Sequence, residues 1–330
     1  MSHKKISIKQ ISELAGVSVA TVSRVINQNG RFSKETEKRV LDIIEKYQYK
    51  PNLIARGLRT NNSLSIGVIV PDITNEFFAK MTRELETYFF QKGYTVIVCN
   101  SEEDPFIEDS YYEHLLTKGV VGMVYLSGKT DKRIRKSQIP TVFIDRILND
   151  ETDAVFIESD NVQGGYLATK ELIEHHCKNI LLVRDKRSIS PPEKRQEGYV
   201  KALKEANIPL DPNYIIKTQV GYETAKSAIQ DALNKKIPFD GVFATTDWMA
   251  LGVINGIREF GLSIPEDVKV VGYDNISISE FSYIPFTTIH QDVIRIAELA
   301  VSSILRLIDS EEVPEKHILV PVMLVKRSSV

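Results

Sequence analysis

Polar side chains directly follow the apolar, strand-like segments in the C-terminal four-fifths of this 330-residue sequence. They are Asp72, Asn100, Asp145-Arg146, Asp247, Asp274-Asn275 and Gln291-Asp292. In doubly wound α/β sheets, ligands bind beyond the carboxyl ends of the strands, which brings such side chains together. Carboxylates, amides and an arginine, Arg195, beside the aromatic pair Phe77 and Phe78 suit a polyhydroxylated ligand.

Each of these residues also has an ordinary structural interpretation. A single aspartate after a strand is more often a helix N-cap or a turn residue. Phe77 and Phe78, taken alone, are more often core residues than a surface that stacks on a ligand. The common position of the polar residues at strand ends nevertheless favours a ligand-binding cleft.

The sequence contains no motif that supports catalysis, a cofactor or a metal. No G-x-G-x-x-G follows a strand, and no G-x-S-x-G is present. Gly128-Lys129-Thr130 resembles the end of a phosphate loop, but Gly122 lies one residue too far upstream for that motif. His175-His176-Cys177 has no second group of ligands, which indicates a surface patch rather than a metal site. An enzyme therefore remains the least supported alternative.

The elements that must position these side chains begin near Ser65. From there, strand-like apolar runs alternate with helical stretches of 3.6-residue periodicity up to the C-terminus. This alternation predicts parallel sheets covered by helices on both faces. The number of units is too large for one small sheet, so we expect two doubly wound lobes side by side.

A different pattern occupies Ile8 to Asn27, IKQISELAGVSVATVSRVIN. Ile8, Ile11 and Leu14 predict one face of a first helix, with Ser7 as its cap and Gly16 in the corner that follows. Val22, Val25 and Ile26 predict the inner face of a second helix, capped by Ser18. Its outer face and N-terminal tip carry small polar and basic groups, as in helices that enter the DNA major groove. An ordinary helical hairpin is the alternative.

Charge distribution supports the nucleic-acid interpretation. Residues 1–60 contain 12 Lys and Arg residues against 5 Asp and Glu, although the whole chain has a net charge of −2. A basic segment on an acidic body indicates a polyanionic partner for that segment alone.

A third helix is expected from Lys34 to about Tyr47, capped by Ser33, with Val40, Leu41, Ile44 and Tyr47 on one face. Residues 51–63 are predicted to form a linker with a short helix that is only marginally stable in isolation.

Composition predicts a cytoplasmic protein. No apolar run reaches the length that spans a membrane, and the N-terminal MSHKKISIKQ lacks the apolar core of a signal peptide. The two cysteines, Cys99 and Cys177, suit a reducing compartment.

The motifs together resemble the LacI/GalR family of bacterial transcription repressors over nearly the full length. They are IKQISELAGVSVATVSRVIN, YKPNLIARGL, IGVIVPDITNEFFA, SDNVQGGYLAT, TTDWMALGVI, VVGYDN and LVKRSS. The resemblance implies a small all-α helix-turn-helix head (1–50), a hinge (51–63) and an α/β body (64–330) that is similar to type I periplasmic binding proteins. The body would comprise an N-lobe (about 64–161 and 291–320) and a C-lobe (about 162–290 and 321–330).

The resemblance also assigns roles in DNA binding. It implies a homodimer, rather than a tetramer, on a pseudo-palindromic operator in double-stranded DNA. Val19 and Ala20 take the base-reading positions, and their small apolar side chains favour thymine methyl groups. The hinge would wedge Leu58, with Ala55 beside it, into a minor-groove step. The supporting contacts to phosphates and bases fall on Ser7, Thr21, Ser23, Arg24 and Asn27.

Effector contacts follow from the same resemblance. They fall on Phe77, Phe78, Asp145, Arg195, Asp247, Asp274 and Gln291, with Trp248 as a further aromatic surface. The implied effector is a small molecule, a mono- or disaccharide or a sugar phosphate, and neither a cofactor nor a membrane is implied. Control by an inducer and control by a co-repressor, either a purine or a phosphorylated carrier protein, both remain open. A sugar-binding module that no longer regulates DNA is a further alternative.

Overall fold

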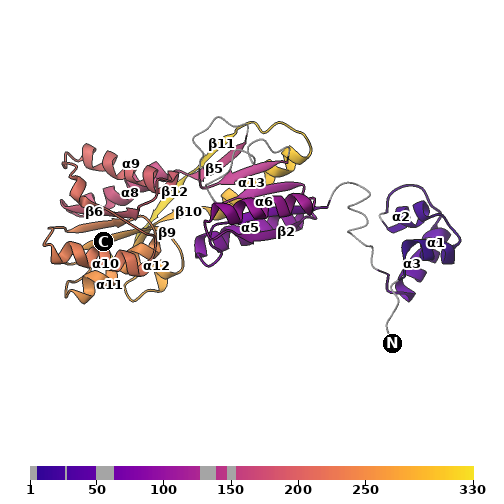
Figure 1. The fold of residues 1–330 in the computed structure, drawn as a ribbon, viewed down its shortest axis with the longest axis horizontal. Coiled ribbons are helices and arrows are strands. Elements are labelled where there is room, and N and C mark those ends of the chain that lie inside the picture. The colour runs from indigo at the N-terminus through magenta and orange to yellow at the C-terminus, as the bar shows by residue number, and fades with distance from the viewer. Residues whose placement is uncertain (1–5, 27, 50–62, 127–138, 147–153) are drawn as a thin grey trace. The chain divides into compact units, whose positions relative to one another are not determined.

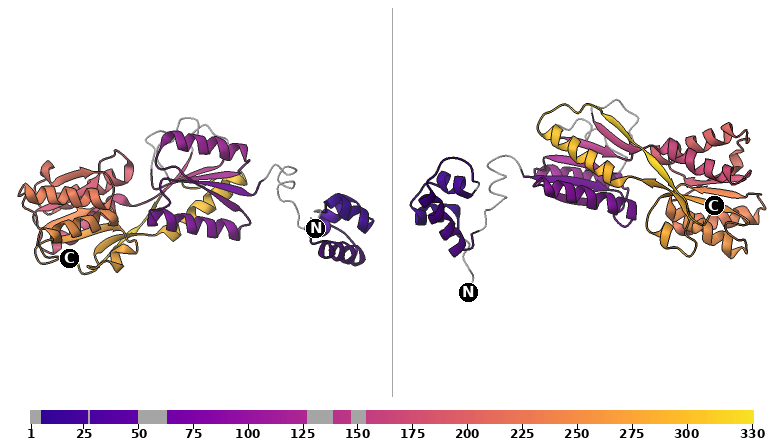
Figure 2. Two further views of the ribbon diagram at one scale, coloured as in Figure 1. Left: turned by 60° about the horizontal axis from the view of Figure 1, so that its bottom comes forward. Right: turned by 180° about the vertical axis from the view of Figure 1, so that it is seen from behind.

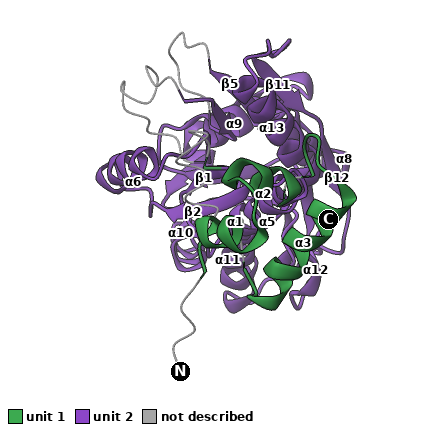
Figure 3. Cartoon of the chain, turned by 90° about the vertical axis from the view of Figure 1, so that its right-hand side faces the viewer, with its two compact units in different colours: residues 1–63 green, residues 64–330 purple. Residues whose placement is uncertain are grey.

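The computed structural model describes residues 6–26, 28–49, 63–126, 139–146 and 154–330. The chain divides into two compact units, residues 1–63 and 64–330, which Figure 3 shows in different colours. Each unit has its own hydrophobic core, and Figure 1 labels the helices and strands of both units.

The described residues of the first unit form three helices: α1 (Ile8–Ala15), α2 (Val19–Ile26) and α3 (Lys34–Lys46). The predicted caps are confirmed, because Ser7, Ser18 and Ser33 each accept a backbone N–H from the first turn of the helix that follows. Gly16 has φ +63°, the left-handed conformation expected of the corner. The core of the unit comprises Ile11, Ala15, Val22, Val25 and Val40.

The predicted inner faces were wrong at three positions. Leu14, Leu41 and Tyr47 are each about half exposed (51%, 46% and 45%). Ala15 is buried in place of Leu14, since Ile11 and Ala15 are four residues apart and lie on the same side of α1. A core this small buries a narrow stripe of each helix.

The N-lobe of the second unit contains a six-stranded, all-parallel sheet in the order β11-β5-β4-β3-β1-β2. Helices α5 (Glu76–Gln91) and α13 (Val293–Ile308) cover one face, and α6 (Pro105–Thr117) covers the other. The strands are β1 (Ser65–Val70), β2 (Thr95–Asn100), β3 (Gly122–Tyr125), β4 (Thr141–Ile144), β5 (Val155–Ser159) and β11 (His317–Val320).

The C-lobe contains a second six-stranded sheet, in the order β12-β10-β9-β8-β6-β7. One face carries α8 (Asn161–Glu174) and α9 (Ser190–Glu205), and the other carries α10 (Tyr222–Asn234) and α11 (Asp247–Glu259). The strands are β6 (Ile180–Asp185), β7 (Ile215–Thr218), β8 (Gly241–Ala244), β9 (Lys269–Asp274), β10 (Thr287–Gln291) and β12 (Val322–Val325). The short helices are the 3₁₀ turn Pro212–Tyr214 and α12 (Ile278–Phe281).

The chain passes between the two sheets after β5, after β10 and between β11 and β12 (Figure 2). The prediction of two doubly wound lobes is confirmed, with one correction: β12 pairs antiparallel with β10. A parallel strand needs a long crossover connection, usually a helix, that brings the chain back to the starting edge of the sheet. Between β11 and β12 there is only Pro321, so β12 cannot be reached by such a crossover. Strand β12 therefore starts beside the end of β10, where Val322 pairs with Gln291.

The central strands of both sheets are buried and consist mainly of aliphatic and aromatic residues, whereas the edge strands β2, β7, β11 and β12 are partly exposed. Gly122 shows how closely a helix approaches. A Cβ there would lie 3.0 Å from the Ile304 side chain of α13.

Candidate effector site and nucleic-acid interface

Helix α2 buries one side in the head and leaves the other available. Val22 and Val25 are buried, whereas Ala20 and Arg24 are exposed and Val19, Thr21 and Ser23 are partly exposed. Ser18 Oγ accepts the backbone N–H of Thr21 (3.1 Å), which fixes the start of the helix. A helix whose N-terminus is exposed presents unpaired N–H groups to phosphates.

The other predicted DNA contacts fall in two groups. Ser7 is exposed and completes a capping box with Gln10: Ser7 N donates to Gln10 Oε1 (2.9 Å), and Gln10 N donates to Ser7 Oγ (3.3 Å). Asn27, Ala55 and Leu58 lie outside the described residues. The predicted roles of all these side chains stay predictions.

In the body, the structure brings five predicted effector residues from widely separated parts of the chain into one group. We call this group, together with Arg146, the interlobe cluster. Asp145 and Arg146 follow β4 of the N-lobe, and the others come from the C-lobe sheet and its helices. The members are Asp145, Arg146, Arg195, Asp247, Asp274 and Gln291.

Arg195 is held rigidly from several sides. Its Nε donates to Asn161 Oδ1 (2.8 Å), and its Nη1 donates to the Thr245 carbonyl (2.5 Å). The guanidinium carbon lies 3.6 Å from the centre of the Tyr273 ring, a cation–π contact, and Nη1 lies 3.8 Å from Asp274 Oδ1. Asn161 belongs to the SDNVQGG motif, so that motif supplies a direct partner for Arg195.

Glycines in α8 and α9 allow this placement. A Cβ at Gly165 would lie 2.0 Å from the carbonyl oxygen of Arg195, and one at Gly198 would lie 2.0 Å from that of Val162. The two helix backbones are thus in contact at the turn of α9 that carries Arg195. A larger residue at Gly165 would push Arg195 away from its partners.

Asp247 has both carboxylate oxygens occupied. Thr288 Oγ1 donates to Oδ1 (2.6 Å), and the Ile276 N–H donates to Oδ2 (2.8 Å). Burial, with the charge of Asp274 acting in the same direction, raises the pKa of Asp247. In this structure Asp247 is occupied with tying α11 to the segment after β9 and to β10.

Asp274 and Gln291 form a second buried pair. Gln291 Nε2 donates to Asp274 Oδ1 (2.7 Å), whereas the buried Gln291 Oε1 has no hydrogen-bond partner among the described residues. Burial raises the pKa of Asp274, and the charge of Arg195 opposes that shift. Asp274 also has φ +109°, so its backbone is constrained at this position.

On the N-lobe side, two adjacent side chains carry buried polar atoms that the described part of the chain does not satisfy. These atoms are Asp145 Oδ1 and Arg146 Nε. Arg146 Nη2 donates to Glu103 Oε1 (2.9 Å), and Glu103 also pairs with Arg187 of the C-lobe. Burial raises the pKa of Asp145, against the opposing charges of Arg195 and Arg146. A buried, unsatisfied acceptor beside a donor is what a polar ligand would complete.

The predicted aromatic contacts lie at the starts of two helices, α5 and α11. Phe77 and Phe78 are buried in the N-lobe core at the start of α5, with ring centroids 5.3 Å apart in an edge arrangement. Trp248, in the first turn of α11, is 38% exposed. Their roles in effector binding stay predictions.

Sequence reasoning missed the polar residues that join the lobes. Glu158 of β5 is fully buried, and its Oε1 accepts from Lys194 of α9 (2.5 Å) and lies 2.8 Å from His317 Nε2. Glu103, which links Arg146 to Arg187, was also not predicted. A glutamate inside the apolar strand VFIES was the available signal for Glu158; the loop residue Glu103 gave none.

In the described ranges, no group of three or more His, Cys, Asp or Glu side chains could hold a metal ion. Among the helices with defined positions, none combines the length and the apolar character needed to cross a bilayer.

Comparison with known proteins assigns the chain to a family. Residues 7–52 match the family model for bacterial regulatory proteins of the lacI family, and residues 169–330 match a periplasmic binding protein-like domain. The transcriptional repressor PurR of Haemophilus influenzae (strain PittEE) is 34% identical over 311 residues, covering 93% of this chain and 92% of that protein. The transcriptional regulator RegA of Clostridium saccharobutylicum is 34% identical over 335 residues, covering 98% of each.

Solved structures agree with this assignment. A lac repressor dimer bound to operator and the anti-inducer ONPF matches with a TM-score of 0.90 at 27% identity, covering 99% of both chains. A LacI family regulator from Enterococcus faecium with bound ribose matches with a TM-score of 0.71 at 30% identity, covering 81% of this chain and 98% of that one. These relatives are regulators and not enzymes, as the sequence predicted. The chain belongs to the LacI family of bacterial transcriptional regulators.

Proposed function

We propose that this repressor binds a pseudo-palindromic operator as a homodimer, and that a neutral, hydroxyl-rich effector at the interlobe cluster controls its affinity for DNA. The observation that carries the effector proposal is that two buried acceptors of the interlobe cluster, Asp145 Oδ1 and Gln291 Oε1, and the donor Arg146 Nε have no hydrogen-bond partner among the described residues. Each sugar hydroxyl can donate to one acceptor and accept from a donor at the same time, so a ligand with several hydroxyls can satisfy all three atoms.

The charges around these atoms favour a neutral sugar over a sugar phosphate. Glu103 already pairs with Arg146 and with Arg187, so these two cations have an anionic partner within the protein. A phosphate group would have to displace Glu103 or lie close to Asp145. Repulsion between like charges in a buried site opposes both arrangements.

A purine is the second candidate, because the relatives include PurR repressors at 34% identity. A purine ring also carries N–H donors that could satisfy Asp145 and Gln291. It needs an aromatic or apolar surface to stack on, and the half-exposed Trp248 is available for that. The sugar and the purine therefore differ in their dependence on Trp248.

The DNA proposal rests on α2 and on the basic charge of the head. Ala20 at the exposed tip, with Val19 beside it, would read thymine methyl groups, and Arg24 would contact phosphate. The hinge residues Ala55 and Leu58 would contact the minor groove.

Exposed aromatic side chains on the C-lobe, Phe281 (78%) and Tyr283 (84%), support a contact between two copies.

A thermal-shift screen of the full-length protein tests the effector class. The panel contains ribose, cellobiose, their phosphorylated forms, hypoxanthine and guanine. A ligand at 100 times its Kd stabilises the folded state by about 2.7 kcal/mol, which raises Tm by several degrees. We expect a neutral sugar to give this shift, and Asp145→Asn to reduce it by half or more.

An operator selected from random duplex DNA tests the regulatory part. Wild-type protein should bind the selected sequence with steep salt dependence, and the stabilising sugar should change its affinity. The sign of that change distinguishes an inducer from a co-repressor. Stabilisation by a sugar without any selected operator would instead indicate a sugar-binding module, and a response to purines alone would contradict the sugar proposal.

A further inference from the structure

The turn after β9 is fixed by side chains that accept its backbone N–H groups one after another. The Asn275 N–H donates to Thr288 Oγ1 (3.3 Å), and the Ile276 N–H donates to Asp247 Oδ2 (2.8 Å). Both acceptors belong to the C-lobe. The turn therefore has a defined shape, although Asn275 adopts the left-handed φ of +52°.

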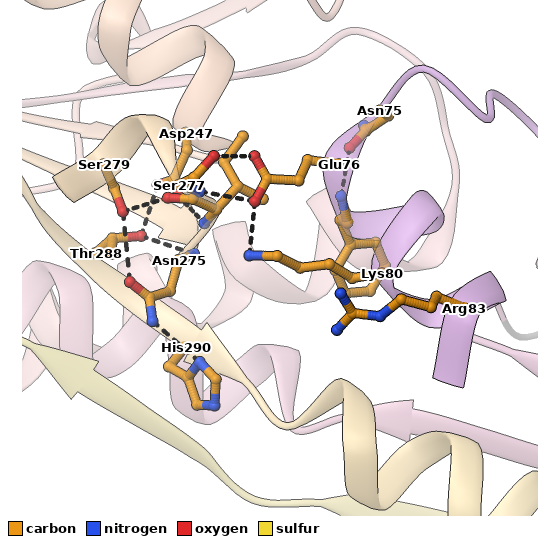
Figure 4. Close-up of polar contacts among 12 residues, drawn as sticks. Asn75, Glu76, Lys80, Arg83, Asp247, Asn275, Ser277, Ser279, Thr288 and His290 are labelled. Atoms are coloured by element: carbon orange, nitrogen blue, oxygen red, sulfur yellow. Dashed lines mark hydrogen bonds and ion pairs between the residues drawn. The ribbon is translucent and has the colours of Figure 1, made fainter. Parts of the chain in front are cut away.

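The next N–H of the same turn is bound by the other lobe. Ser277 N donates to Oε1 of Glu76 (2.9 Å), and Ser277 Oγ donates to Glu76 Oε2 (Figure 4). Glu76 is the first residue of α5 in the N-lobe, and Lys80 of the same helix lies 2.6 Å from Oε1. Burial acts to raise the pKa of Glu76, but the hydrogen bonds from Lys80 and Ser277 outweigh it and lower that pKa. Glu76 is thus an ionised acceptor with two donors from one C-lobe residue.

Apolar packing accompanies this polar contact. Ile276 is 3% exposed and belongs to the N-lobe core cluster that contains Phe77 and Phe78. The C-lobe turn therefore inserts one side chain into the N-lobe core, directly beside the Glu76–Ser277 hydrogen bonds. Separating the lobes here would expose Ile276 and leave Ser277 without its partner.

The same turn begins at a residue of the interlobe cluster. Asp274 is followed without a break by Asn275, Ile276 and Ser277, and Gln291 holds its carboxylate. The three backbone N–H groups that follow are each hydrogen bonded, the third to Glu76 of α5. Asp274 and α5 are therefore linked through three consecutive residues of one turn.

We propose that Glu76 is a positioning residue: through Ser277 it joins α5 to the turn that carries Asp274, so that the state of the effector site sets how tightly the lobes close and thereby the affinity for operator. This rests on the proposed function in taking Asp274 as an effector residue and DNA as the target. Asp274 would contact the effector, and Glu76 acts through the turn.

Trp248 provides a readout of lobe closure, because it is the single tryptophan of the sequence and follows Asp247, which holds Ile276. In full-length protein without ligand, we expect Glu76→Ala to raise the acrylamide quenching constant of Trp248 about twofold. Glu76→Gln should restore it, since the amide can accept from Ser277 N and donate to Ser277 Oγ. Glu86→Gln, an exposed carboxylate on the same helix, is the matched control and should behave as wild type.

Operator affinity supplies the second measurement. On DNA selected by the wild type, Glu76→Ala should change the affinity by about fivefold or more, while Glu76→Gln and Glu86→Gln stay near wild type. Ser277→Ala, which removes one of the two donors, should give a smaller change in the same direction. A decrease shows that closed lobes favour DNA, and an increase shows that open lobes do.

The proposal is overturned if Glu76→Ala and Glu86→Gln give equal quenching constants, or if they bind the operator equally. If the wild type selects no operator, the proposed function fails, and the quenching comparison still decides whether Glu76 holds the lobes together. Should Glu76→Ala fail to fold, the same two measurements on Ser277→Ala test the proposal instead.

Discussion

The two sides of the interlobe cluster differ in how completely their polar groups are paired. On the C-lobe side, Arg195 and Asp247 have partners for their main hydrogen-bonding groups, and Gln291 Oε1 is the one atom of the cluster there without a partner in the described structure. On the N-lobe side, both residues of the cluster have such an atom, Asp145 Oδ1 and Arg146 Nε. The C-lobe half is therefore largely preorganised, whereas the N-lobe half is completed by what binds. Substitutions in the two halves should separate into losses of folding and losses of binding.

The largest effect on folding is expected at Gly165. Because a Cβ there would lie 2.0 Å from the Arg195 carbonyl oxygen, Gly165→Ala must separate α8 from α9. We expect a loss of about 3 kcal/mol of unfolding free energy or more, measured by urea denaturation. Lys170→Ala, at an exposed position of the same helix, is the control and should change it by less than about 0.5 kcal/mol. Equal stability of the two variants would contradict the close helix contact.

Removal of the Asp247 carboxylate should come next. Asp247→Ala leaves Thr288 Oγ1 and the Ile276 N–H without acceptors, at a cost of about 2 kcal/mol in the same denaturation measurement. Asp231→Ala, an exposed aspartate on α10, serves as control. A loss no larger than that of the control would mean that Asp247 is not a structural tie.

The pH dependence of stability tests Asp274 within the preorganised half. Burial raises its pKa from an ordinary 3.8 to about 7. Between these values the folded state keeps a proton that the unfolded state has lost, so the contribution to stability is full below about pH 4 and is lost as the pH rises through 7. We expect Tm of the ligand-free protein to fall by several degrees from pH 5 to pH 8, and Asp274→Asn to reduce this fall. The same pH slope in both proteins would exclude Asp274 as its source.

The smallest effect on folding is expected at Asp145. Burial already raises its pKa, and its Oδ1 has no partner in the described structure, so Asp145→Asn should leave the unfolding free energy within about 1 kcal/mol of wild type or increase it. The same variant should weaken effector binding at least about tenfold, measured by calorimetry with whichever sugar stabilises the wild type. A large loss of stability with intact binding would reverse the assignment of the two halves.

Local signals in the sequence were sufficient for the helix caps and the corner of the head. Ser7, Gly16, Ser18 and Ser33 each act within one turn of their own position, so residue type and spacing specify them. The prediction that Leu14 is buried was wrong, because α3 determines whether Leu14 or its neighbour Ala15 faces the core. The apolar pattern of a single helix carries no information on where another helix packs.

The predictions for the body show the same difference between local signals and long-range packing. Strand ends predicted the residues that the structure gathers at the junction, since all parallel strands point their carboxyl ends to one side. The partners that join the lobes, such as Glu158 with Lys194 and Glu76 with Ser277, are far apart in the sequence and depend on how closely the lobes approach.

The bridge from Arg146 through Glu103 to Arg187 affects how salt titrations of this regulator should be interpreted. Mobile ions compete with DNA phosphates for the head, and they also screen a partly exposed ionic contact inside the body. The slope of operator affinity against ionic strength therefore combines counterion release with a change in the protein's own conformational balance. Comparing wild type with Glu103→Gln over a salt series would separate the two contributions, and a bacterium whose internal osmolarity fluctuates would experience both.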